Sequence, residues 1–193
     1  FKNMGLKSTH QIAEIEINPK NPDIVYAAAV GHLWGYSGER GLFMTKDGGS
    51  SWNRVEGGLP NDGKTGCTEI IFHPENPDIM FAGFYHRLRQ PASFVSGGEQ
   101  GGLFKSTDGG KNWKKITTGL ARGKSGMIDI SIHLNNPKIM VMAYEADENI
   151  PDGEPGTGVY ISYDAGESWN FLLKHAVRPF YHGQIEIDPI NPE

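Results

Sequence analysis

The 193-residue sequence has one cysteine, Cys67, which excludes an internal disulfide and most thiolate metal sites. It has no apolar run close to the length of a transmembrane helix, which is about 18 residues. It has no excess of positive charge either. With 18 basic and 23 acidic residues, the formal net charge is −5, which gives no support to a nucleic-acid or anionic-membrane partner. No segment shows a convincing helical period, so these absences together favour an all-β protein without a cofactor.

What the sequence does contain is a motif, Ser/Thr-x-Asp-x-Gly-x-x-Trp, that occurs three times. The hydroxyl and carboxylate can bond to backbone groups within a tight turn, glycine accepts a positive φ, and tryptophan begins the returning strand. An aspartate held by its own turn is a poor acid or base, so we expect a structural role. The motif residues are Thr45, Asp47, Gly49 and Trp52, then Ser106, Asp108, Gly110 and Trp113, and finally Ser162, Asp164, Gly166 and Trp169.

Two markers share one period. The motif aspartates are 61 and 56 residues apart, and four Asn-Pro pairs place their prolines 55, 60 and 55 residues apart. Such agreement indicates an array of repeats. Each repeat holds about four strand-like runs, which is typical of a propeller blade. The expected strands cover residues 11–18, 24–30, 41–45 and 52–56, then 67–73, 79–85, 102–106 and 113–117, and then 127–133, 139–145, 158–162 and 169–174.

The sequence therefore predicts part of a single β-propeller across residues 1–193, with four-stranded antiparallel blades at 11–56, 67–117 and 127–174. A further blade begins at 183–193. In the first strand we expect Ile12, Ile15 and Ile17 to be buried, with a bulge at Ala13–Glu14 where the alternation slips. Three blades and one strand cannot close a ring of 4–8 blades. We expect the remaining blades of a longer chain, or other copies, to cover the open ends.

Candidate binding residues lie on the face opposite the Asn-Pro turns, in loops of uneven length and content. These loops cover residues 31–40, 86–101 and 174–183. Arg87 and Arg89 either contact a ligand or brace their loop, and Trp34 either stacks on a ligand or packs. Metal binding by histidines or by the acidic loop 146–157 is not expected. The candidate ligand-binding residues are His32, Trp34, Arg40, His86, Arg87, Arg89, Arg178, Tyr181 and His182.

The repeated motif resembles the BNR or Asp-box repeat of sialidases, xyloglucanase-type glucanases, sortilin-type receptors and photosystem-assembly propellers. The segments 9–12, 21–28, 31–35, 39–43 and 178–181 resemble the sortilin-like N-terminal propeller of large exported bacterial proteins, often labelled glycosyl hydrolases. This resemblance implies a structural Asp box and a location in the periplasm, at the outer membrane surface or outside the cell. It implies no reaction, because fold alone does not confer one.

Three functions follow as hypotheses. In the first, the loop face binds a protein or a glycan. In the second, the chain is a glycoside hydrolase of the xyloglucanase type, with Glu39 and Glu99 as its two carboxylic acids. In the third, it is a structural module of a larger complex. A sialidase is disfavoured because the early Arg-Ile-Pro segment of that family is missing.

Overall fold

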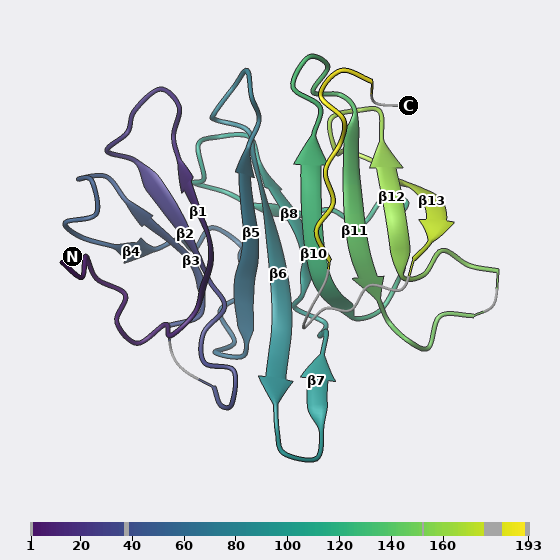
Figure 1. The fold of residues 1–193 in the computed structure, drawn as a ribbon, viewed down its shortest axis with the longest axis horizontal. Coiled ribbons are helices and arrows are strands. Elements are labelled where there is room, and N and C mark those ends of the chain that lie inside the picture. The colour runs from purple at the N-terminus through teal and green to yellow at the C-terminus, as the bar shows by residue number, and fades with distance from the viewer. Residues whose placement is uncertain (1, 37–38, 152, 176–182, 192–193) are drawn as a thin grey trace.

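The structure is a computed structural model that describes residues 2–36, 39–151, 153–175 and 183–191. Within these ranges the chain forms strands and no helix, so no helix there is long and apolar enough to cross a membrane. Three antiparallel sheets stand side by side (Figure 1), and each is built from one sequence repeat. The predicted all-β propeller of four-stranded blades, with about three blades present, is confirmed.

The strands run in order from the inner to the outer edge of each blade. Blade 1 consists of β1 (Ile12–Ile17), β2 (Val25–Ala29), β3 (Gly41–Thr45) and β4 (Asn53–Arg54). Blade 2 consists of β5 (Thr65–Phe72), β6 (Met80–Arg89), β8 (Gly102–Ser106) and β9 (Lys114–Lys115), with β7 (Phe94–Ser96) paired to β6. Blade 3 consists of β10 (Ser125–Ile132), β11 (Met140–Ala146), β12 (Gly158–Ser162) and β13 (Asn170–Lys174).

The expected bulge in the first strand is confirmed, since the β1–β2 register shifts between Ile12 and Glu14. Residues 183–188, expected to be a strand, are not paired into a sheet among the described residues. They instead run beside β10, where the backbone N–H groups of Ile185 and Ile187 donate to the side chains of Asp129 and Ser131. Adjacent blades are therefore joined at the inner edge through side chains.

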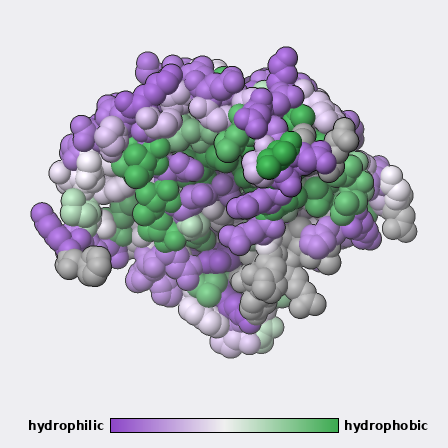
Figure 2. All heavy atoms as spheres, turned by 45° about the horizontal axis from the view of Figure 1, so that its top comes forward, coloured by the Kyte–Doolittle hydropathy of each residue, from purple (hydrophilic) through white to green (hydrophobic). Residues whose placement is uncertain are grey.

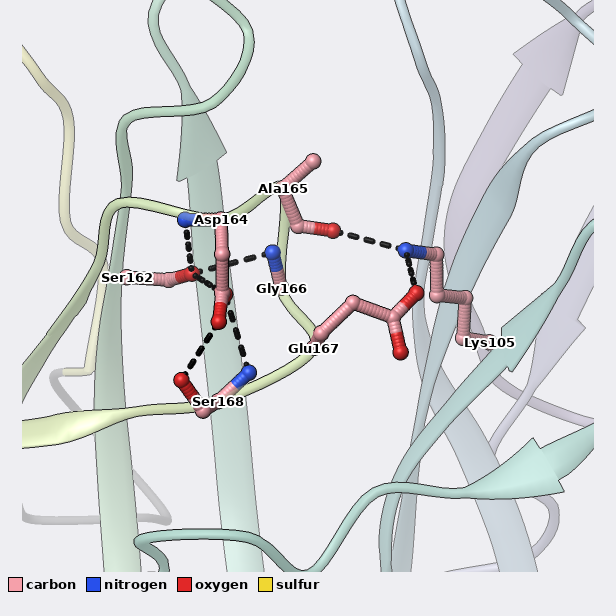
Figure 3. A network of polar contacts seen from close by, with 7 residues as sticks. All are labelled: Lys105, Ser162, Asp164, Ala165, Gly166, Glu167 and Ser168. Atoms are coloured by element: carbon pink, nitrogen blue, oxygen red, sulfur yellow. Dashed lines mark hydrogen bonds and ion pairs between the residues drawn. The ribbon is translucent and has the colours of Figure 1, made fainter.

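Each Asp box closes its turn as the motif predicts. In the third box, the Ser162 hydroxyl donates to Asp164 at 2.8 Å and accepts from the Gly166 N–H at 2.9 Å. Asp164 also accepts from the backbone and hydroxyl of Ser168 (Figure 3). Ser51 and Asn112 take the place of Ser168 in the other two boxes, so a polar residue before the tryptophan belongs to the motif.

The hydrophobic core lies between blades. One cluster joins blade 1 to blade 2 around Tyr26, Leu42 and Ile70, and a second joins blade 2 to blade 3 around Phe81 and Ile130. Blade 2 therefore packs one of its faces on blade 1 and the other on blade 3.

The expectation that Ile12, Ile15 and Ile17 are buried is wrong for this chain, because all three are exposed. Ile15 is 62% exposed, whereas Ile70, its counterpart 55 residues later, is fully buried against blade 1. The described residues place no blade against this face of β1. Figure 2 shows hydrophobic patches among the hydrophilic surface on the side of the molecule it presents.

Candidate functional site on the loop face

The loop face carries a projecting hairpin where the sequence predicted an irregular loop. β6 continues to Arg89 and returns as β7, so the hairpin extends below the three sheets in Figure 1. Its tip is closed by a bond from the Gln90 N–H to the Ser93 carbonyl at 2.8 Å and by a bond between their side chains. The polar–apolar–polar order of Arg87, Leu88 and Arg89 was a strand signal that the length of the loop concealed.

The hairpin is fastened to the 31–36 loop of blade 1. The backbone N–H of Arg89 donates to the carbonyl of Leu33 at 2.9 Å. Phe94 pairs with Arg89 across the hairpin, so Trp34 and Phe94 belong to the two segments that meet at this bond. The side chains of Trp34, Tyr36 and Phe94 are 57%, 46% and 62% exposed. Exposed aromatic rings on segments fixed by backbone bonding form a suitable platform for stacking.

A polar contact stands beside these rings. The Tyr36 hydroxyl lies 3.0 Å from His86 Nε2, and the two rings are tilted at 5.7 Å between centroids. Burial lowers the pKa of His86, which favours the neutral imidazole at neutral pH. His32 lies across the loop, where its Nδ1 accepts from the Trp34 N–H at 3.1 Å and its ring meets His10 edge-on at 4.6 Å.

Arg40 was expected to contact a ligand, but the structure places it in the interior. Its side chain is fully buried, and its guanidinium donates to five backbone carbonyls. The acceptors belong to Val30, Lys64, Arg87, His32 and Gly35. These bonds tie the 31–36 loop to both neighbouring segments, so Arg40 braces the loop from the interior.

Arg87 and Arg89 are each half-buried on the hairpin. The Arg87 guanidinium donates to the side-chain oxygen of Gln11, and burial lowers the pKa of Arg87. Arg87 thus links blade 2 to the entry of blade 1. The remaining candidates on this face, Arg178, Tyr181 and His182, lie outside the described residues.

The two candidate carboxylic acids have different surroundings. Glu39 is half-buried and accepts two hydrogen bonds from Ser8, from its N–H at 2.9 Å and from its hydroxyl. Glu99 is exposed beyond the hairpin, where its backbone carbonyl accepts from Lys115 Nζ at 2.9 Å. Their role as an acid and base pair stays a prediction. In the described ranges, no group of three or more metal-ligating side chains is suited to hold an ion.

A polar cavity near the inner edges of the blades was not predicted. Its volume is about 220 Å³, and three carboxylic side chains, Glu14, Glu69 and Asp129, contribute to its lining. Tyr85 and Arg87 of the hairpin strand and Gln184 of the C-terminal segment complete its polar wall. The signal was available in the sequence, because these acids and Gln184 are 55, 60 and 55 residues apart, the same spacing as the Asn-Pro prolines.

Comparison with known proteins supports the fold. A family model of the BNR/Asp-box repeat matches residues 104–115, which contain the second box. A search of curated proteins finds no match.

Solved structures extend the likeness to most of the chain. The GH74 enzyme of Niastella koreensis aligns with 94% of this chain at 18% identity and a TM-score of 0.64. The GH74 xyloglucanase of Xanthomonas campestris aligns with 94% at 19% identity and a TM-score of 0.64. YCF48 bound to the D1 peptide aligns with 89% at 17% identity and a TM-score of 0.51.

At these identities the likeness concerns the fold. The chain spans 27%, 26% and 42% of the length of those three structures. Together with the three Asp-box turns and the four-stranded sheets, the matches show that this chain contains the BNR/Asp-box repeat and has the fold of a β-propeller.

Proposed function

We propose that this chain is a binding propeller that recognises a protein or glycan ligand through its loop face. The observation that carries the proposal is the set of exposed aromatic side chains, Trp34, Tyr36 and Phe94, on two segments joined by the Arg89–Leu33 backbone bond. Aromatic rings with polar neighbours stack on sugar rings or receive side chains of a peptide. The neighbours here are His86, which contacts Tyr36, and Arg89, which pairs with Phe94 across the hairpin.

Peptide binding by a related fold adds support for a protein ligand, since YCF48 has been solved with the D1 peptide. The same proposal places the chain in an exported, sortilin-like bacterial protein, as the sequence resemblance implies. Fractionation of the source cells tests that location, and recovery in the cytoplasm would contradict it.

The binding role is tested on peptide and polysaccharide arrays, followed by titration of each captured ligand. Trp34→Ala and Phe94→Ala are expected to weaken binding at least about tenfold, as for a central aromatic contact. Tyr163→Ala is the matched control, because Tyr163 is equally exposed but lies in the third Asp box on the opposite face. Unchanged affinity in the Trp34→Ala/Phe94→Ala double variant would remove the loop face from the binding role.

Hydrolysis remains the alternative that the sequence suggested, with Glu39 and Glu99 as the acids. Its test is activity on a panel of β-glucans before and after Glu39→Gln and Glu99→Gln. Activity that both variants retain in full would exclude these two residues from catalysis.

A further inference from the structure

Three carboxylic side chains converge at the inner edges of the three blades. Glu14 lies on β1, Glu69 on β5 and Asp129 on β10, at matching positions of the repeat, and all three line one cavity. The Glu69 side chain is buried in this cavity, and burial together with the neighbouring carboxyl groups of Glu14 and Asp129 raises its pKa. A hydrogen bond between two carboxyl groups requires that one of them carries a proton.

The two outer carboxylates have donors of their own. Glu14 Oε2 accepts from the backbone N–H of Ile70 at 3.4 Å, and Asp129 Oδ2 accepts from the backbone N–H of Ile185. Each therefore contacts the backbone of the following repeat. Burial raises the pKa of Asp129 as well, and the hydrogen bond from the Ile185 N–H offsets only part of that rise. Glu69 sits between them with only 6% of its side chain exposed.

Other charged groups around Glu69 do not stabilise its ionised form over its protonated form. Cys67 on the same strand and Glu16 on β1 add no positive charge, and Glu186 in the C-terminal segment adds negative charge near Asp129. On β6, Tyr85 bonds to Ser96, and Arg87 is engaged with the side chain of Gln11. Burial and the two neighbouring carboxyl groups therefore both favour the protonated form of Glu69.

We propose that Glu14, Glu69 and Asp129 form a proton-sharing clasp at the inner edges of the three blades, in which the single O–H of protonated Glu69 donates to one neighbouring carboxylate at a time. The clasp is a pH-sensitive element of the fold. Loss of its proton in alkaline solution leaves three converging negative charges between β1, β5 and β10, which repel one another and loosen the packing there.

The sign of the effect follows from linkage. The folded state retains a proton that the unfolded chain has lost, so stability falls as pH rises above the ordinary range of a glutamate. Urea unfolding of the 193-residue chain between pH 7 and pH 9 should show a folding equilibrium constant that falls by up to about tenfold per pH unit for one such proton. Glu69→Gln supplies permanent N–H donors to both neighbours, so its pH slope should be flat by comparison.

Controls keep the test decisive. Glu99→Gln removes an exposed carboxylate and should keep the parent slope. If Glu69→Gln does not fold, the Glu14→Gln/Asp129→Asn double variant serves instead, because both amides can donate to an ionised Glu69 and remove the need for the proton. Infrared spectroscopy at pH 7 should show a protonated-carboxyl band that these clasp variants lose. Equal pH slopes in the parent and in the clasp variants, or a parent spectrum without that band, would overturn the proposal.

Discussion

Lys105 Nζ lies 2.6 Å from Glu167 Oε1, and this contact joins the third strand of blade 2 to the Asp box of blade 3 (Figure 3). The same ammonium donates to the Ala165 carbonyl at 2.7 Å and stands 5.2 Å from the centre of the Phe81 ring. Lys105 is buried whereas Glu167 is mostly exposed, so the pair is a rim contact with one buried partner.

This geometry predicts a modest coupling between blades. A double-mutant cycle with Lys105→Met and Glu167→Gln should give a coupling free energy of about 0.2–1 kcal/mol, the range of exposed ion pairs. The methionine copies Met44, which occupies the matching position of blade 1. Urea unfolding at low and high salt measures this coupling free energy. A coupling that does not decrease at high salt would contradict an ionic origin.

The Asp boxes predict a specific loss of stability in acid. The hydrogen bond from the Asn112 side chain, with the others in the turn, lowers the pKa of Asp108 to about 2. Because the folded pKa is depressed, the stabilisation is present above the ordinary aspartate range and is lost as pH falls from about 4 towards about 2. Thermal unfolding of Asp108→Asn should show a smaller drop over that interval than the parent. Asp78→Asn, on an exposed neighbouring turn, should follow the parent.

The third Asp box contains a correctable strain. Ala165 has φ of 57°, where the other two boxes have Gly48 at 63° and Gly109 at 71°. A left-handed conformation costs an alanine about 1–2 kcal/mol. Replacing it with glycine removes this cost, but the greater conformational entropy of glycine in the unfolded chain offsets part of the gain. Ala165→Gly should therefore raise the free energy of unfolding by up to about 1 kcal/mol, and Gly109→Ala should lower it. A destabilised Ala165→Gly chain would show that the methyl group contributes more than the strain costs.

The repeat offers a matched pair of core substitutions. Ile70→Ala should cost about 2–5 kcal/mol, because it opens a cavity between blades 1 and 2. Ile15→Ala removes the same atoms from the same repeat position but from an exposed side chain, so it should change the stability of this chain very little. Urea denaturation compares the two. A large cost for Ile15→Ala would mean that another blade or another copy covers β1 in solution.

We expect substitution of Arg40 to lower stability, whereas substitution of the exposed aromatic side chains should leave stability unchanged. Arg40→Met should destabilise the chain by more than about 3 kcal/mol, because several carbonyls lose their donor at a cost of about 1–3 kcal/mol each. Trp34→Ala should leave the melting temperature within error of the parent. A stable Arg40→Met chain would mean that water replaces the guanidinium.

The features that the sequence predicted well are local. The Asp boxes, the third strands and the bulge at Ala13 follow from backbone requirements of a few neighbouring residues. What it did not reveal depends on distant segments. In the sequence Arg40 resembles any other loop arginine. Its buried role depends on the backbone carbonyls of Lys64 and Arg87, which only the folded chain brings next to it. The three clasp acids, on strands 55 and 60 residues apart, meet only when the blades pack.

The five bonds of Arg40 have one more consequence, for how this surface can change over time. They end on main-chain oxygens, which every residue type provides, so the bonds themselves specify no side chain in the loop. Gly31 is the exception, because a Cβ there would clash with Arg40 Cγ. Residues such as Trp34 and Tyr36 are therefore free to be exchanged while the loop keeps its path. The exposed side chains of the loop face can therefore vary while the backbone that carries them stays in place. Such a surface is suited to diversification by evolution or by a randomised library.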